Sequence, residues 1–278
     1  MRLTLPLIAA LAFAGEGCAQ ETAPAADPAL PPADNGPPPL CTDRPTKSNS
    51  ACAVEPGYWQ VETDLMNGTV QHLDGVTTDT WLVTNPTLKY GLVKDVDIEV
   101  NIAPYEVVRT RDTSGQRTED GVGDLYLRVK YMAFSNSDGS VQVGLFPYVK
   151  APTAPLGIGN RAWEGGVSAP VNLTLDSQWG LTFSPEVDDF KNQSGDGRHL
   201  NTSQTVNLSY NLPKDVTLYG ELWGDWNFDP AGTIRQVSLD LAVTKLIGKL
   251  FKLDGGVDIG LNRATPGVQV YAGLSKKW

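Results

Sequence analysis

The residues best suited to chemistry in this sequence are carboxylates that recur at every second position of short apolar segments. The segment DVDIEVN (95–101) places Asp97 and Glu99 between valine and isoleucine residues. Such alternation is typical of a β-strand with one apolar and one polar face. Carboxylates along the polar face can line a wet passage and set its ion preference, or they can pair with bases across it. The sequence favours neither interpretation over the other.

The same phase recurs along the chain, and it defines a set of candidate lumen-lining residues. These are Glu62, Asp64, Asp97, Glu99, Asp124, Arg128, Lys130, Lys150, Glu186, Asp188, Glu221, Asp225, Asp240, Asp254 and Asp258. We add Trp223 and Arg263 as lumen or mouth candidates, on their positions alone. Acids outnumber bases in this set. It therefore indicates an electronegative passage or a binding site for cations or polar solutes, and the alternative is a network of ion pairs that fills the interior.

Groups able to catalyse a reaction or bind a metal are sparse. The only histidines, His72 and His199, fall in predicted loops. Ser203 would lie ~13 Å from His199 on one strand, beyond hydrogen-bond reach. No cluster has metal-ligand spacing, and GIGNRAWEGG (157–166) lacks the Lys-Ser/Thr ending of a phosphate loop. We predict no enzyme, cofactor or metal site; an outer-membrane barrel hydrolase and a secreted soluble ligand-binding β-protein remain alternatives.

The N-terminal residues predict export. Arg2 precedes an apolar run at 3–14 that is too short to span a bilayer, so we predict a signal peptide over 1–19. Lipid modification of Cys18 is the weaker alternative, because the preceding Gly and Glu suit a lipoprotein site badly. The Ala/Pro-rich residues 20–40 are expected to form an extended linker.

Residues 41–57 are predicted to be a segment closed by a disulfide. Cys41 and Cys52 flank a short loop, and in an oxidising compartment they should pair. Closing such a loop contributes about 3 kcal/mol in the chain-entropy model. A redox or metal site would need more ligands than two cysteines. The sequence leaves open whether residues 20–57 plug a lumen or trail outside it.

The remainder, 58–278, consists of about twelve alternating segments without helical periodicity. Short turns such as LPKD alternate with longer Gly/Asp-rich connections such as RTRDTSGQRTEDGVGD, and both ends of the domain fall on the short side. This is the layout of an outer-membrane barrel, in which apolar side chains face lipid and polar ones face the lumen. A soluble sandwich would bury the apolar faces instead. We predict a transmembrane antiparallel up-and-down β-barrel of about 12 strands.

Two further features refine this prediction. The terminal Trp278 resembles the C-terminal signal by which the barrel-assembly machinery recognises such chains, although Lys276 interrupts its phase. Prolines, which cannot donate to a strand ladder, predict bulges, kinks or divided strands at Pro86, Pro104, Pro147, Pro170 and Pro185.

The net charge of −10 argues against nucleic acid as a partner.

Several stretches carry a family resemblance: CTDRPTK, TNPTLKYGL, NIAPYEVVRTR, DGVGDLYLRVKY, PYVKAPTAPLGIGN, GELWGDWNFDP and LNRATPGVQVYAGLSKKW. From about Cys41 to Trp278 the chain resembles the outer-membrane transporter family labelled for the meta-pathway of phenol degradation. The resemblance implies a barrel in the outer membrane of a Gram-negative bacterium that takes up a small solute, with aromatic compounds as candidates. It assigns no binding residues. Such barrels usually end in Phe, whereas this chain ends in Trp.

Overall fold

The structure is a computed structural model and describes residues 37–278. The predicted signal peptide, Cys18 and most of the predicted linker lie outside the described residues. The described part contains no helix long and apolar enough to cross a membrane.

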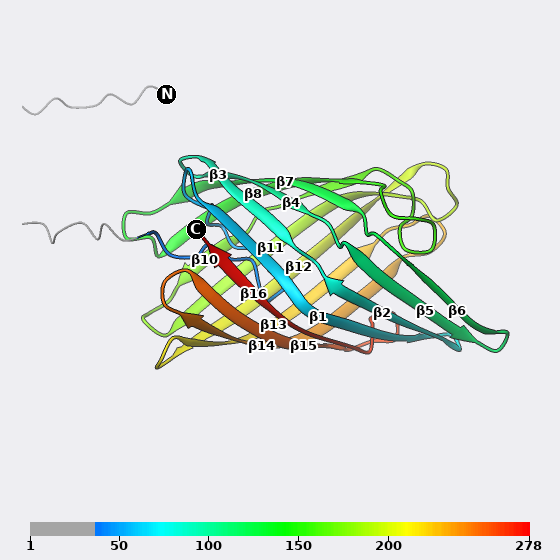
Figure 1. The fold of residues 1–278 in the computed structure, drawn as a ribbon. Coiled ribbons are helices and arrows are strands. Elements are labelled where there is room, and N and C mark those ends of the chain that lie inside the picture. Colours follow the sequence, from blue (N-terminus) through cyan, green and yellow to red (C-terminus); the bar gives the residue numbers. More distant parts are fainter. Residues whose placement is uncertain (1–36) are drawn as a thin grey trace, which may run out of the picture. The chain divides into compact units, whose positions relative to one another are not determined.

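Strands make up most of the described chain, and they close into an antiparallel barrel of 12 strands, whose arrangement is shown in Figure 1. Sixteen strand segments are numbered, because four barrel strands are each interrupted once. The segments are β1 (Trp59–Leu73), β2 (Val76–Thr84), β3 (Thr87–Val93), β4 (Val96–Asn101), β5 (Tyr105–Asp112), β6 (Gly115–Gly121), β7 (Leu125–Ser135), β8 (Val141–Ala151), β9 (Glu164–Ser168), β10 (Val171–Thr174), β11 (Trp179–Lys191), β12 (Arg198–Leu212), β13 (Val216–Asn227), β14 (Ile234–Ile247), β15 (Phe251–Gly260) and β16 (Val268–Lys277).

The barrel closes where the last strand meets the first. β16 pairs with β1 in antiparallel register from Gln60↔Lys277 to Val70↔Val268. The backbone N–H of Trp278 donates to the carbonyl of Trp59 (3.0 Å), and the N–H of Trp59 donates back to Trp278 (3.1 Å). The final residue is therefore part of the seam, and the predicted barrel is confirmed.

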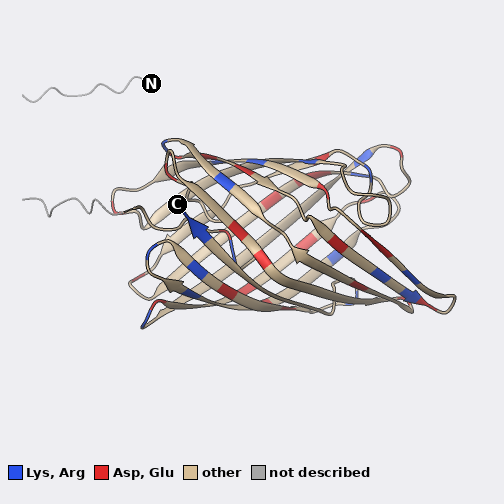
Figure 2. Cartoon of the chain, in the orientation of Figure 1, with Lys and Arg blue, Asp and Glu red and all other residues tan. Residues whose placement is uncertain are grey.

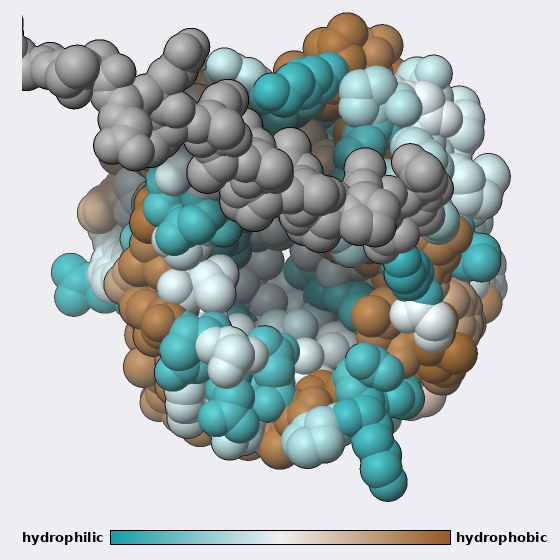
Figure 3. Space-filling view, turned by 90° about the vertical axis from the view of Figure 1, so that its left-hand side faces the viewer, coloured by the Kyte–Doolittle hydropathy of each residue, from teal (hydrophilic) through white to brown (hydrophobic). Residues whose placement is uncertain are grey.

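The two faces of each strand point as the alternation predicted. Leu127 and Val129 on β7 are 44% and 42% exposed on the outer surface, whereas Lys130 beside them is 0% exposed. Figure 2 shows charged residues recurring along the strands. Figure 3 looks along the barrel and shows hydrophilic residues around a central hollow, with hydrophobic residues on the outer rim. A soluble sandwich would have buried the aliphatic rows against one another, so that alternative is wrong.

Three of the five prolines mark interruptions. Pro86 lies between β2 and β3, Pro104 just before β5, and Pro170 between β9 and β10. Pro147 and Pro185 lie within β8 and β11. The fourth interruption, at residues 122–124, contains no proline.

The first interruption reverses the phase of one side chain. The segment TWLVTNPTLKYGL (80–92), treated as one alternating strand, predicts that Leu82 shares the outer face with Leu88. The register shifts between Leu82 and Thr84, and Leu82 instead lines an interior cavity. A bulge moves every later side chain to the opposite face, which explains the error.

The two ends of the barrel differ. The terminal end holds the C-terminus and short turns such as 94–95 and 213–215. For the opposite end, the hairpin end, the Gly/Asp-rich segments NGTVQHLDGVTTD (67–79), RTRDTSGQRTEDGVGD (109–124) and DDFKNQSGDGRH (188–199) predict long loops. This prediction is wrong, because most of these residues extend the strands and leave only short turns at 74–75, 113–114 and 192–197.

The reason for that error is visible at the tips. Asp74 and Gly75 both have positive φ (49° and 81°), the geometry of a tight two-residue hairpin turn. The β5–β6 hairpin projects beyond the rest of the barrel (Figure 1), and most of β6 is exposed. A strand with water on both faces has no apolar side, so the sequence shows no alternation there.

Candidate functional site

The lumen at the terminal end is occupied by residues 41–57, named the plug. The plug is closed by the Cys41–Cys52 disulfide, whose Cα atoms are 5.8 Å apart. Ala51 and Val54 are 0% exposed. The backbone N–H of Ala51 donates to Asn172 of β10, and that of Val54 donates to Asp97 of β4, on different sides of the wall. The segment therefore lies inside the lumen rather than trailing outside it.

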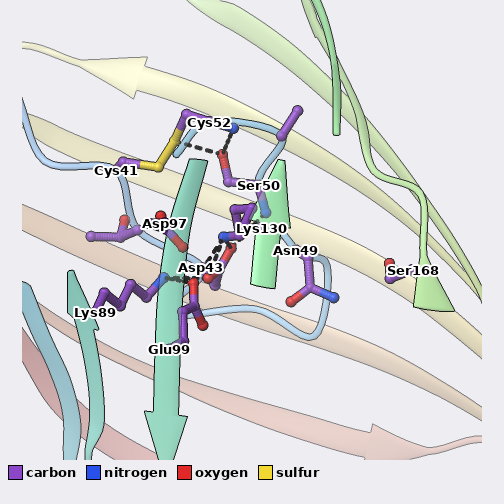
Figure 4. A network of polar contacts seen from close by, with 12 residues as sticks. Cys41, Asp43, Asn49, Ser50, Cys52, Lys89, Asp97, Glu99, Lys130 and Ser168 are labelled. Atoms are coloured by element: carbon purple, nitrogen blue, oxygen red, sulfur yellow. Dashed lines mark hydrogen bonds and ion pairs between the residues drawn. A yellow bond between two sulfur atoms is a disulfide. The ribbon is translucent and has the colours of Figure 1, made fainter. Parts of the chain in front are cut away.

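Asp43 of the plug lies at the centre of a charged network (Figure 4). Lys130 Nζ is 2.5 and 2.6 Å from its two oxygens, and Lys89 also pairs with it. Lys89 further contacts Glu62 (2.6 Å) and Glu99 (3.2 Å). Burial alone would raise the pKa of Asp43, but the ammonium groups of Lys130 and Lys89 outweigh it and hold this pKa well below its ordinary value.

Arg44 ties the plug to two more strands. Its Nη1 is 2.6 Å from Asp64 on β1, and its Nη2 is 2.7 Å from Asp254 on β15. Gly273 on β16 makes room for this side chain, because a Cβ there would lie 2.2 Å from Nη2. The guanidinium thus satisfies two buried carboxylates through charge-assisted hydrogen bonds.

Lys47 continues the plug's contacts to the opposite wall. Its Nζ is 2.7 Å from Asp240 and 2.5 Å from Asp258, and it lies 5.5 Å from the ring centroid of Trp223. Glu221 accepts hydrogen bonds from the backbone N–H groups of Lys47 (2.8 Å) and Ser48 (3.1 Å). Wall carboxylates therefore form ion pairs with a plug side chain and accept hydrogen bonds from backbone N–H groups of the plug.

The C-terminal strand holds the edge of the plug. Lys277 is 0% exposed, and its Nζ lies 2.5 Å from Glu55 and 2.5 Å from the carbonyl oxygen of Pro39. The Gln60 side chain on β1 makes reciprocal hydrogen bonds with the backbone of Cys41. The seam strands therefore also anchor the start of the plug.

Beyond the plug, toward the hairpin end, the lumen opens into a cavity of about 660 Å³, named the vestibule. Asp43, Arg44 and Thr46 form its floor. Its walls include Glu106, Asp124, Tyr126, Arg128, Phe146, Tyr148 and Glu186. A side cavity of about 350 Å³ shares Glu186 with the vestibule and adds Asp188, Asn201, Trp223 and Asp225. The vestibule falls within the size range of small-molecule sites.

The candidate residues divide between these two regions. Direct contacts with the plug are made by Glu62, Asp64, Asp97, Lys130, Glu221, Asp240, Asp254 and Asp258. Glu99 joins the same network through Lys89 and Lys130. The vestibule or side cavity is lined by Asp124, Arg128, Glu186, Asp188, Trp223 and Asp225. Lys150 pairs with Asp124 (3.2 Å) and Glu164 (2.7 Å).

One candidate does not line the lumen. The Arg263 side chain is 84% exposed and pairs with Asp74 at the hairpin end. Residue 263 follows the end of β15, where the strand alternation no longer fixes direction. Lys89 was missed, although its position between Leu88 and Tyr90 in an alternating segment would have identified it.

The two histidines lie apart from this network. The Nδ1 atom of His72 is 3.0 Å from Thr77 Oγ1, and that of His199 is 3.0 Å from Asn192 Oδ1. In residues 37–278 the structure shows no hydrogen bond between His199 and Ser203, and no group of residues able to hold a metal ion.

Comparisons with known proteins agree with this architecture. A family model described as "Putative MetA-pathway of phenol degradation" matches residues 42–278. The β-domain of the Bordetella autotransporter BrkA is 16% identical with a TM-score of 0.50, covering 81% of this chain and 100% of that one. The NanC porin is 9% identical with a TM-score of 0.49, covering 77% of this chain and 98% of that one. No curated protein matches. At these identities the BrkA likeness concerns the fold alone.

Proposed function

Because this chain belongs to the family described as "Putative MetA-pathway of phenol degradation", we propose that it is an outer-membrane channel for passive uptake of a small solute. Its membership confirms the resemblance noted in the sequence, over the same residues. The proposal places the barrel in the outer membrane of a Gram-negative bacterium, with its apolar rows against lipid. Recognition of the C-terminal strand by the barrel-assembly machinery stays a prediction.

The observation that carries this proposal is the charged vestibule inside the barrel. A barrel wall that is aliphatic outside and lined inside by groups such as Arg128 and Glu186 forms a wet compartment across the barrel. The vestibule's volume suits a molecule of small-metabolite size. Tyr126, Phe146 and Tyr148 on its wall offer surfaces for an aromatic solute, which the family description also favours.

The plug sets the size limit of the channel. A solute that reaches the vestibule must pass between the wall and a segment held by Arg44, Lys47 and Asp43. We therefore propose slow, size-limited passage rather than the large flux of an open porin. No catalytic step forms part of the proposal.

Flux into vesicles tests this function directly. Full-length purified protein is inserted into lipid vesicles, and uptake of glycerol, benzoate and benzyl alcohol is compared with empty vesicles. We expect uptake above the empty-vesicle rate for at least the smaller solutes. Correct insertion is checked by migration on a gel with and without boiling, since folded barrels migrate differently. Uptake equal to empty vesicles for all three solutes, with folded protein present, would contradict the proposal.

A further inference from the structure

The charges of the vestibule differ from those around the plug, because several lack a partner of opposite sign. Among residues 37–278, Arg128 forms no direct ion pair with a carboxylate, and its guanidinium carbon lies 5.2 Å from the centroid of the Tyr126 ring. Glu186, Asp188 and Asp225 likewise form no ion pair with a Lys, Arg or His of the described chain. Arg128 and Glu186 line the same cavity.

The strand register places Arg128 and Asp188 on the same inner face of the wall, at the two edges of a strip formed by β8 and β9. Arg128 on β7 pairs with Tyr148 on β8, Tyr148 with Gly166 on β9, and Gly166 with Asp188 on β11. Three strand spacings separate the Cα atoms of Arg128 and Asp188 by roughly 14 Å. The basic group and the acidic cluster therefore face one another across a strip of wall two strands wide.

The strip carries the aromatic rings of Tyr126 and Tyr148, and Gly166 leaves the space that the Tyr148 ring occupies. A Cβ at Gly166 would lie 2.0 Å from Asp188 Oδ1 and 2.9 Å from a ring carbon of Tyr148. Its absence lets Tyr148 lie over β9 and donate its hydroxyl to Asp188 Oδ1 at 2.8 Å. Tyr126 packs beside Tyr148 with ring centroids 6.0 Å apart. The part of the vestibule wall between the two charged groups is thus covered by two aromatic rings, those of Tyr126 and Tyr148.

The acidic side is held in place by an amide. The Nδ2 of Asn201 donates to Asp188 Oδ2 (3.0 Å) and to Asp225 Oδ1 (2.8 Å), and Asn201 is 3% exposed. This single donor group fixes two carboxylates but does not neutralise their charge. The acidic cluster therefore attracts a cation, and Arg128 on the other side of the strip attracts an anion.

We propose that the vestibule binds a small aromatic zwitterion, with its carboxylate on Arg128, its ammonium group on Glu186 and the neighbouring acids, and its ring against Tyr126 and Tyr148. This inference rests on the proposed channel function and names its solute class. A guanidinium binds a carboxylate through two parallel hydrogen bonds. An α-amino acid bridging two charges in this way spans roughly 8 Å, including two hydrogen bonds of ~2.8 Å.

Solutes with a single charge satisfy only one side. An anion placed on Arg128 would face Glu186 and Asp188 across the strip, and a cation placed on those acids would face Arg128. Like charges close together in a cavity are unfavourable, so both are disfavoured relative to the zwitterion. An uncharged aromatic compound would use the rings alone.

Binding to the full-length protein in detergent tests the inference without requiring transport. Saturation-transfer NMR compares phenylalanine with phenylacetate and phenethylamine, which lack the ammonium and the carboxylate respectively. We expect phenylalanine to bind about tenfold more tightly than either, the effect of one lost charge-assisted hydrogen bond. Arg128→Gln should remove its advantage over phenethylamine, and Glu186→Gln should remove its advantage over phenylacetate.

Three controls keep the result interpretable. Lys94→Gln and Asp196→Asn change exposed charges outside both cavities and should leave binding unchanged. Arg128→Lys keeps the charge and should restore part of the affinity, whereas Arg128→Gln does not. Each variant must show the gel mobility of the folded barrel.

The outcomes separate this inference from the channel function. Equal binding of all three compounds, or unchanged phenylalanine binding in folded Arg128→Gln, overturns the zwitterion site even if vesicle uptake is observed. Selective phenylalanine binding without uptake of any solute supports the site and contradicts the channel. Loss of selectivity in Arg128→Gln together with uptake supports both.

Discussion

The two halves of this lumen use the same kind of wall in opposite ways. In the plug half, wall carboxylates such as Asp64 and Asp254 are matched by plug cations such as Arg44. In the vestibule half, Arg128, Glu186 and Asp225 form no direct ion pair among the described residues. Paired charges hold a segment in place, and unpaired charges are available to a solute. The plug therefore decides the role of the wall residues that it meets, whereas Lys150 and Asp124 in the vestibule half pair with one another.

This difference also resolves the two interpretations that the sequence left open. A network of ion pairs that fills the barrel describes the plug half, and an accessible charged compartment describes the vestibule half. The network depends on a segment from outside the barrel strands, since Asp43, Arg44 and Lys47 supply most of the groups that meet the wall. Changes that remove the plug or its contacts should therefore leave the wall charges of the plug half unpaired and accessible, as they are in the vestibule half.

The largest expected effect follows from removing the plug. A chain without residues 41–57 loses the floor of the vestibule. Its single-channel conductance in a planar bilayer should rise at least several-fold, because the plug obstructs a lumen that is already narrow in a barrel of this size. Heat unfolding in detergent should also occur at lower temperature, since Lys89 and Lys130 lose Asp43. An unchanged conductance in a folded barrel would show that the plug does not obstruct the passage.

The second effect concerns stability. Arg44→Ala leaves Asp64 and Asp254 buried without their cation, and the free energy of unfolding should fall by about 3 kcal/mol, as for other broken buried pairs. Urea unfolding in detergent measures it. Arg263→Ala is the matched control, because its ion pair with Asp74 is exposed and should contribute nothing measurable. Equal destabilisation by both variants would mean that Arg44 does not anchor the plug.

The third effect concerns plug mobility. Replacing Cys41 and Cys52 together by serine removes the loop closure, which stabilises the folded chain by about 3 kcal/mol at most in the chain-entropy model. Because the ion pairs of Arg44 and Lys47 remain, we expect the mean conductance to change little but brief openings to become more frequent. Single-channel recording distinguishes these events. Steady traces identical to those of the unsubstituted protein would argue that the ion pairs alone immobilise the plug.

The smallest expected effect lies in the vestibule. Glu186→Gln removes a carboxylate that forms no direct ion pair in the described chain, so stability should stay within about 0.5 kcal/mol. The reversal potential under a KCl gradient should nevertheless shift toward anions, because charge in a narrow passage sets ion preference. Glu55→Gln, a change beside Lys277 in the plug half, should destabilise the protein more. A larger loss of stability in Glu186→Gln than in Glu55→Gln would contradict the distinction between the plug half and the vestibule half.

The barrel wall could be predicted because its faces differ in polarity. Alternation placed Glu99, Lys130 and Asp240 on the inner face, and the same rule would have added Lys89. The plug could not be placed, because residues 41–57 have no periodicity and reveal their partners only when the barrel closes around them. The extended hairpins were hidden for a related reason, since a strand with water on both faces has no apolar row. Leu82 was misplaced because Pro86 predicts an interruption of the strand but does not show that the interruption reverses the phase of the side chains.

The most direct test places a spin label on two adjacent residues of β7. Leu127→Cys and Arg128→Cys are labelled separately, with the Cys41–Cys52 disulfide intact and the unsubstituted protein as background, in barrels reconstituted into lipid. At position 127 we expect relaxation by lipid-dissolved oxygen and protection from an aqueous nickel complex; at position 128 we expect the reverse. Labels that both respond to the aqueous complex, or both to oxygen alone, would contradict a wall that separates lipid from a wet, charged interior.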